Sequence, residues 1–164
     1  MKRIKLLALA LAGVMTLALL TGCSDGKSKA ELVEEYFRYV MHNQQKDEVL
    51  DKKLEIIAQK FQPDSWLDGE QKLTSEAYDV LRAELSDYLV TGGFWFWYGE
   101  VKPGQSALMQ EESMKYSAGI EYDTLNPDAQ LLQAIAFTTT GRKSDGHRYY
   151  LALETYATIN TPQN

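Results

Sequence analysis

Residues able to carry chemistry are few in this chain of 164 residues. It contains one cysteine, Cys23, and two histidines, His42 and His147. Nucleophilic catalysis requires a nucleophile with a base beside it, and no glycine-flanked serine or second nearby histidine completes such a set. His147 and Tyr149 form the one pair that we single out as a weak pocket candidate. We predict no catalytic residues and expect both histidines to lie at the surface.

The acidic stretch from Asp64 partly matches a calcium-binding loop. Asp64, Asp68 and Gly69 occupy the first, fifth and sixth positions of such a loop. Trp66 stands at the third position and Ser75 at the twelfth, where oxygen ligands are required. We therefore predict no metal site, and we expect no cofactor.

Five consecutive aromatic residues, Phe94, Trp95, Phe96, Trp97 and Tyr98, are the most unusual feature of the sequence. In a strand, alternate side chains point to opposite faces, so the two tryptophans share one face and the other three residues share the second. One face must belong to the core. The other face either lies under a helix or loop of the same chain or forms a binding surface, for which Trp and Tyr are typical anchors.

The N-terminus has the order of a secretory signal. Three basic residues within the first five precede fifteen uncharged residues, 6–20. This apolar run fits an export signal, whereas a membrane-spanning helix needs about 20 apolar residues. We therefore expect residues 1–22 to be removed on export.

The segment Leu20-Thr21-Gly22-Cys23 resembles the lipobox of bacterial lipoproteins. The resemblance implies that Cys23 receives a diacylglyceryl group and becomes the mature N-terminus, an anchor in the membrane. Residues 23–30 are then a polar, flexible tether. The alternative is an ordinary signal peptide with an incidental cysteine. We expect a lipid-anchored protein on the extracytoplasmic face of the cell membrane, with a Gram-positive envelope favoured, or of the outer membrane in a two-membrane envelope.

The charge of the chain argues against nucleic acid as a partner. Removing residues 1–22 removes three of the 17 basic residues and no acidic one, which leaves 14 against 23 and a formal charge of −9. Phosphate backbones require clustered Lys and Arg. With Cys23 acylated no thiol remains, so the exported domain must be stable without disulfides.

Three stretches have the apolar spacing of helices. The first runs from Glu31 to Met41, the second follows a capping Asp47, and the third follows a capping Thr74. Their apolar stripes are, in order, Leu32, Val33, Tyr36, Phe37, Val40 and Met41; Leu50, Leu54, Ile57, Ala58 and Phe61; and Ala77, Leu81, Leu85, Tyr88 and Leu89.

After Gly93 the apolar period becomes two, which indicates strands. The predicted strands cover the aromatic run, the segment 113–123, residues 131–140 and residues 147–159. Pro103 and Gly104 predict a turn between the first two strands, and Ser144-Asp145-Gly146 predicts a hairpin between the last two. Glu111 and Glu112 are expected to be solvated.

Helices followed by strands predict a single α+β domain over residues 31–160, with the helices packed on a curved four-stranded antiparallel meander. This element order resembles the cone-shaped nuclear-transport-factor-like folds and the extracytoplasmic domains of type IV secretion assembly proteins, and cystatin-like sheets are a second match. The resemblance rests on element order alone.

For function, the sequence favours a non-enzymatic, membrane-anchored module that binds another envelope protein, within a secretion, conjugation or surface-exclusion system. Its basis is an anchored acidic domain with an aromatic strand and no catalytic set. The alternatives are a small-ligand binder with an aromatic cavity, and an immunity or inhibitor lipoprotein.

Overall fold

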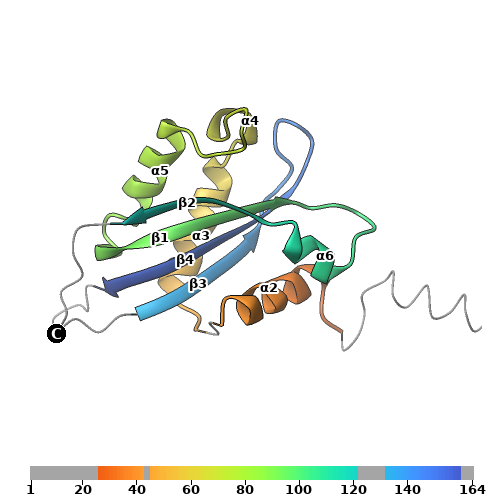
Figure 1. Ribbon diagram of the computed structural model, residues 1–164, viewed down its shortest axis with the longest axis horizontal. Coiled ribbons are helices and arrows are strands. Elements are labelled where there is room, and N and C mark those ends of the chain that lie inside the picture. Colours follow the sequence, from red (N-terminus) through yellow and green to blue (C-terminus); the bar gives the residue numbers. More distant parts are fainter. Residues whose placement is uncertain (1–25, 43–44, 122–131, 160–164) are drawn as a thin grey trace, which may run out of the picture.

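The computed structural model describes residues 26–42, 45–121 and 132–159, which form an α+β fold (Figure 1). The predicted leader, Cys23 and the start of the tether lie outside these residues. The helices are α2 (Lys29–Val40), α3 (Glu48–Lys60), α4 (Pro63–Trp66), α5 (Ser75–Leu85) and α6 (Ala107–Glu112), and the strands are β1 (Leu89–Glu100), β2 (Lys115–Glu121), β3 (Leu132–Thr139) and β4 (Tyr149–Ile159).

Side-chain caps fix where the long helices begin. Asp47 accepts hydrogen bonds from the first turn of α3, and Thr74 does so for α5, as predicted. Ser28 caps α2 in a reciprocal arrangement with Glu31. This cap starts α2 at Lys29, so the last two residues of the predicted tether belong to the helix.

The sheet is antiparallel, and its strands lie in the order β2-β1-β4-β3. The expectation of a meander is therefore wrong, because a meander would place β2 beside β3. The central pairing instead joins β1 to β4, from Leu89 opposite Ile159 to Glu100 opposite Tyr149. These two strands carry large apolar side chains on both faces, which suits them to the centre of a sheet covered on both sides.

The connection between β1 and β2 contains a helix that the sequence analysis missed. Gly104 adopts a positive φ of 87°, as a turn there requires, and α6 follows it. Ser106 caps α6 by accepting a hydrogen bond from the Met109 amide. Glu111 is buried rather than solvated, because α6 turns it toward the protein.

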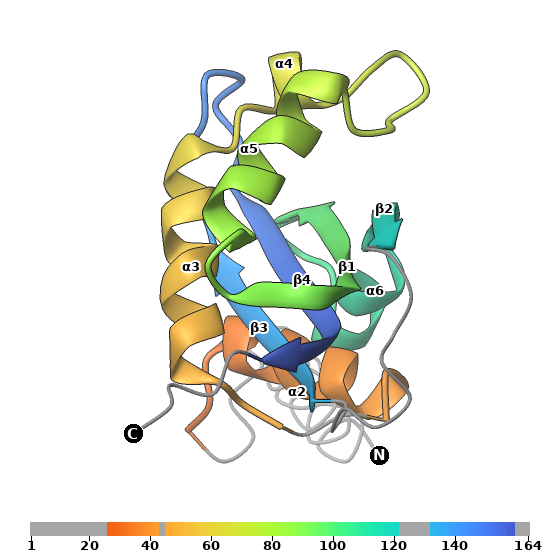
Figure 2. The same ribbon diagram turned by 90° about the vertical axis from the view of Figure 1, so that its left-hand side faces the viewer.

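The larger core lies on the side of the sheet covered by α3, α4 and α5 (Figure 2). The predicted stripe of α3 faces this core, and so do Ala77, Leu81, Leu85 and Tyr88 of the third predicted stripe, whereas Leu89 of that stripe begins β1 instead of continuing the helix. Phe61, just after α3, packs edge-on against Trp66 and Tyr149, with ring centroids 5.5 and 5.3 Å away. Phe94, Phe96 and Tyr98 supply the contribution of β1.

The smaller core lies on the other side of the sheet, under α2 and α6. Val33 and Phe37 are the inward apolar residues of α2, whereas Tyr36 and Val40 of the predicted stripe are exposed. Buried Arg38 donates a hydrogen bond of 2.7 Å to the carbonyl of Ile135 on β3. The carbonyl of Gln45 accepts the Ile135 amide at 3.2 Å, so both outward-facing backbone groups of this edge residue have partners.

Candidate functional site

A half-open cleft of about 450 Å³ lies between the segment around α4, the end of β1 and the turn that joins β3 to β4. Its polar side chains come from segments far apart in the sequence, which the central β1–β4 pairing and the packing of α4 bring together. The charged and aromatic lining residues are Asp64, Asp68, Glu100, Asp145, Lys102, Lys115, Tyr98 and Tyr149.

The β3–β4 turn holds Asp145 in place at the cleft. Gly146 takes a positive φ of 83°, which lets the chain reverse. Asp145 then accepts hydrogen bonds from the Tyr149 hydroxyl at 2.5 Å and the His147 amide at 2.9 Å. Burial alone would raise the pKa of Asp145, but these hydrogen bonds and the nearby His147 outweigh it and lower the pKa. Asp145 is therefore ionised at neutral pH.

Tyr149 stays protonated as the partner of Asp145. Burial, together with the hydrogen bond and the charge of Asp145, raises the pKa of the Tyr149 hydroxyl. Its proton points to a carboxylate, so Tyr149 stabilises that negative charge and does not serve as a base.

Three further contacts fix the walls of the cleft. The Ser144 hydroxyl donates to Asp64 at 2.8 Å, and the Lys143 ammonium donates to the carbonyl of Ala58 at 2.6 Å, which ties the turn to the α3–α4 segment. The Tyr98 hydroxyl donates to the carbonyl of Gln71 at 2.9 Å. The cleft therefore has walls that are already fixed before any ligand arrives.

Asp68 shapes its own loop. Its carboxylate accepts the amides of Glu70 and Lys72 at 2.8 and 2.9 Å. This is the part of the sequence that matched a calcium loop only in part. Within residues 26–42, 45–121 and 132–159, no group of three or more His, Cys, Asp or Glu side chains is placed to hold a metal ion.

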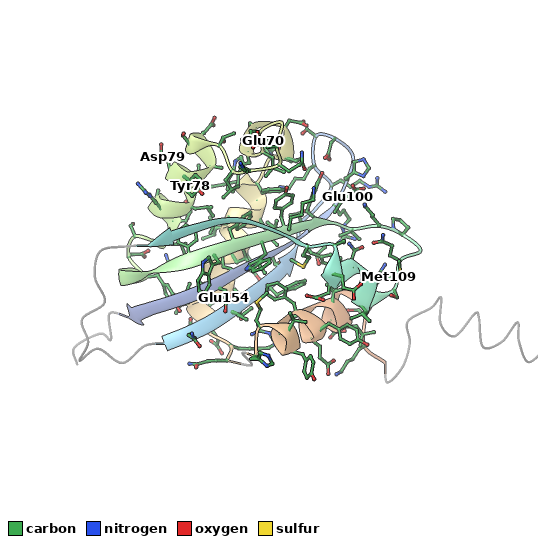
Figure 3. The ribbon with its side chains drawn as sticks, in the orientation of Figure 1. Glu70, Tyr78, Asp79, Glu100, Met109 and Glu154 are labelled. Atoms are coloured by element: carbon green, nitrogen blue, oxygen red, sulfur yellow. The ribbon has the colours of Figure 1, made fainter. Side chains whose placement is uncertain are left out.

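The pair singled out in the sequence lies at this cleft. Tyr149 lines it, and exposed His147 sits at its border with Nδ1 2.8 Å from Oε1 of Glu100. Figure 3 labels Glu100 near the end of β1. His42 lies just after α2, exposed and with a positive φ of 51°, as expected for a helix end.

Charge gives the cleft its chemical preference. Four carboxylates face two ammonium groups, Lys102 and Lys115. The excess of negative charge in a partly enclosed site favours a cationic group. Tyr98 and Tyr149 line the cleft but are only 3% and 8% exposed, so they offer a cation little aromatic surface.

The aromatic run is divided by the sheet. Phe94, Phe96 and Tyr98 are buried in the larger core, so they form no surface. Trp95 and Trp97 point to the α2 side and are half-buried. Trp97 meets Phe37 edge-on with ring centroids 5.6 Å apart, which places it under α2. Any binding role of this strand would fall on Trp95 and on the part of Trp97 that stays accessible.

Tyr149, Tyr98 and His147 were predicted as candidate residues from the sequence, whereas the cleft was not predicted. Asp64 and Asp68 were considered only as calcium ligands, while Asp145 was considered only as a turn residue. The sequence signal for the cleft was weak, because the acidic residues lie in separate turns. Their proximity can be predicted only if the strand order is known.

Comparisons with protein-family models, with curated proteins and with solved structures give no match for this chain. Within the described residues, the helices are all too short or too polar to span a bilayer.

Proposed function

We propose that this protein is an extracytoplasmic lipoprotein, held to the cell membrane by lipid on Cys23, whose domain binds a cationic segment of another envelope protein in the acidic cleft. The cleft carries the proposal: its preformed walls and excess of carboxylates are what a Lys- or Arg-bearing segment requires. The formal charge of −9 for the chain from Cys23 adds long-range attraction for a basic partner. The function proposed is recognition, not catalysis.

Two of the walls of the cleft lie far from the proposed anchor. α4 and the β3–β4 turn, which contribute two of its walls, lie at the end of the molecule opposite α2 (Figures 1 and 2). If lipid on Cys23 holds the start of α2 near the bilayer, these two walls lie on the far side of the domain, whereas the wall formed by Lys102 lies nearer the membrane, because Lys29 of α2 donates a hydrogen bond to the Lys102 carbonyl. The resemblance to cone-shaped and cystatin-like folds, and a place in a secretion or conjugation system, stay predictions.

A small cationic ligand is the second candidate. A cleft of about 450 Å³ falls within the range of roughly 300–1,000 Å³ typical of small-molecule sites. The sequence had predicted that a small ligand would bind in a cavity lined by the aromatic run. Phe94 and Phe96 lie in the filled core, so this second candidate is supported by the acidic cleft instead.

Titration with a hexalysine peptide and with spermidine tests both candidates. We expect saturable binding, followed through the backbone amide signals of residues 98–102 and 144–149. Glu100→Gln should weaken binding about tenfold at low salt, because one of the four carboxylates loses its charge. Asp79→Asn is the matched control, since Asp79 is exposed on α5 and does not line the cleft (Figure 3).

The outcomes separate the two candidates. Binding of the peptide alone supports a protein segment as the ligand, and saturation by spermidine alone supports the small ligand. Equal weakening in the Glu100 and Asp79 variants would show attraction to the whole acidic domain, and absence of saturable binding by either probe would remove the cleft as the site.

A further inference from the structure

Helix α6 has its apolar and polar residues reversed. Gln110 and Glu111 are buried, whereas Leu108 and Met109 point outward with 47% and 53% of their surfaces exposed. A surface helix normally turns its apolar residues to the core. An exposed apolar pair on a helix that buries polar residues therefore indicates a contact surface.

The hydrogen bonds of Gln110 show that this rotation of α6 is fixed. Its side-chain oxygen accepts the Lys102 amide at 2.7 Å, and its side-chain nitrogen donates to the Glu100 carbonyl at 2.6 Å. Turning Leu108 and Met109 inward would break both bonds and leave buried polar groups without partners. The outward position of the pair is thus part of the fold.

The outer face of α6 lies close to the proposed lipid anchor. α6 packs directly against α2, and Lys29, the first residue of α2, donates a hydrogen bond of 3.0 Å to the carbonyl of Lys102 in the segment leading to α6. Cys23 precedes Lys29 by six residues. Even fully extended, that length of chain reaches about 20 Å, so a lipid on Cys23 would hold this part of the domain at the bilayer surface.

We propose that the outer face of α6, with Leu108 and Met109, rests on the lipid surface and orients the domain. This inference rests on the proposed lipid anchor at Cys23. Two apolar side chains are too few to anchor a protein, but they suffice to select one orientation of an anchored domain. Exposed Glu112 on the same helix restricts the contact to the headgroup region. Tyr36 and Tyr39, exposed on neighbouring α2, are of the residue type enriched at that depth.

Methionine methyl signals provide the test, because processing at Cys23 leaves three methionines, Met41, Met109 and Met114. The full chain is produced in bacteria with ¹³C-methyl methionine, its intact mass is recorded, and it is placed in lipid nanodiscs with and without spin-labelled lipid. We expect the spin label to broaden the exposed Met109 signal at least threefold more than the signal of buried Met114.

Two variants sharpen the measurement. Leu108→Gln should reduce the broadening of Met109 at least twofold. Val49→Gln replaces a comparably exposed residue of α3, on the other side of the sheet, and should leave the broadening unchanged. Equal broadening of Met109 and Met114 on a lipidated chain would overturn the contact while the anchor stands.

The intact mass decides the anchor separately. If Cys23 carries no lipid, the anchor proposal fails, and the same thiol is then coupled to a maleimide lipid and the broadening measured again. Preferential broadening of Met109 in that sample would support lipid contact by α6, and its absence would overturn it.

Discussion

The side of the sheet under α3, α4 and α5 buries mainly aliphatic and aromatic side chains, whereas the α2 and α6 side also buries Arg38, Gln110 and Glu154. On the first side, the predicted helical stripes are inside. On the second, Tyr36, Leu108 and Met109 are outside. The contrast indicates that the first side supplies most of the stability, while the second is shaped by hydrogen bonds that set positions and by an outer surface suited to contact.

The largest loss of stability is expected for a substitution in the core under α3, α4 and α5. Phe61→Ala removes a fully buried ring that packs on Trp66, Phe96 and Tyr149. We expect the free energy of unfolding to fall by about 4 kcal/mol, because a cavity is left in a closely packed core. Denaturant titration measures it, with exposed Ile56→Ala on α3 as the control that should change little. If Phe61→Ala lowers the free energy of unfolding by less than about 1 kcal/mol, this side of the sheet does not supply most of the stability.

On the second side, Arg38→Ala should cost about 2–3 kcal/mol through polar rather than apolar loss. Arg38 is buried, pairs with Glu34 at 2.8 Å and donates to the carbonyls of Gln45 and Ile135. Hydrogen exchange at the Ile135 amide should accelerate along with the loss of stability. Arg82→Ala, at an exposed site on α5, should leave both the stability and the exchange rate unchanged. If it lowered stability as much as Arg38→Ala, the loss would come from the change in net charge and not from the hydrogen bonds of Arg38.

Glu154→Gln should produce the smallest change, a gain in stability of about 1 kcal/mol at pH 7. Glu154 lies on β4 (Figure 3), on the same face of the sheet as Tyr150 and Ala152, and is only 8% exposed. Burial raises its pKa, so at pH values between the unfolded and the folded pKa the folded state retains a proton that the unfolded state releases. The stability linked to this proton is complete below the unfolded pKa and is lost as pH rises through the folded pKa.

The difference between wild type and Glu154→Gln should therefore disappear below about pH 4. Thermal unfolding between pH 4 and 8 checks this, with exposed Glu55→Gln as the control. A variant less stable than wild type at pH 7 would show that the Glu154 carboxylate has a stabilising partner.

The long helices could be predicted because their signals are local. Asp47 and Thr74 cap α3 and α5 as the spacing of polar and apolar residues indicated, and the Asp145-Gly146 turn joins β3 and β4. A cap and the stripe behind it lie within a few turns of one another, so the sequence contains the whole signal.

The missed features depend on contacts between distant residues. α6 is six residues long with its apolar pair outward, so its pattern does not indicate a buried helix. The pairing of β1 with β4 joins residues about 50 to 70 positions apart, and no local pattern specifies it. The cleft depends on this pairing, which is why Asp64 and Asp145 could not be placed together from the sequence.

The contacts at Ile135 affect how neighbouring copies of the protein can pair along the β3 edge. β3 is an edge strand, and such edges invite strand addition by a second copy. Arg38 and Gln45 occupy the outward carbonyl and amide of Ile135 near the middle of β3. A neighbouring chain would have to displace Arg38 and Gln45 before it could pair along the middle of β3, which disfavours strand addition at this point even at high local density.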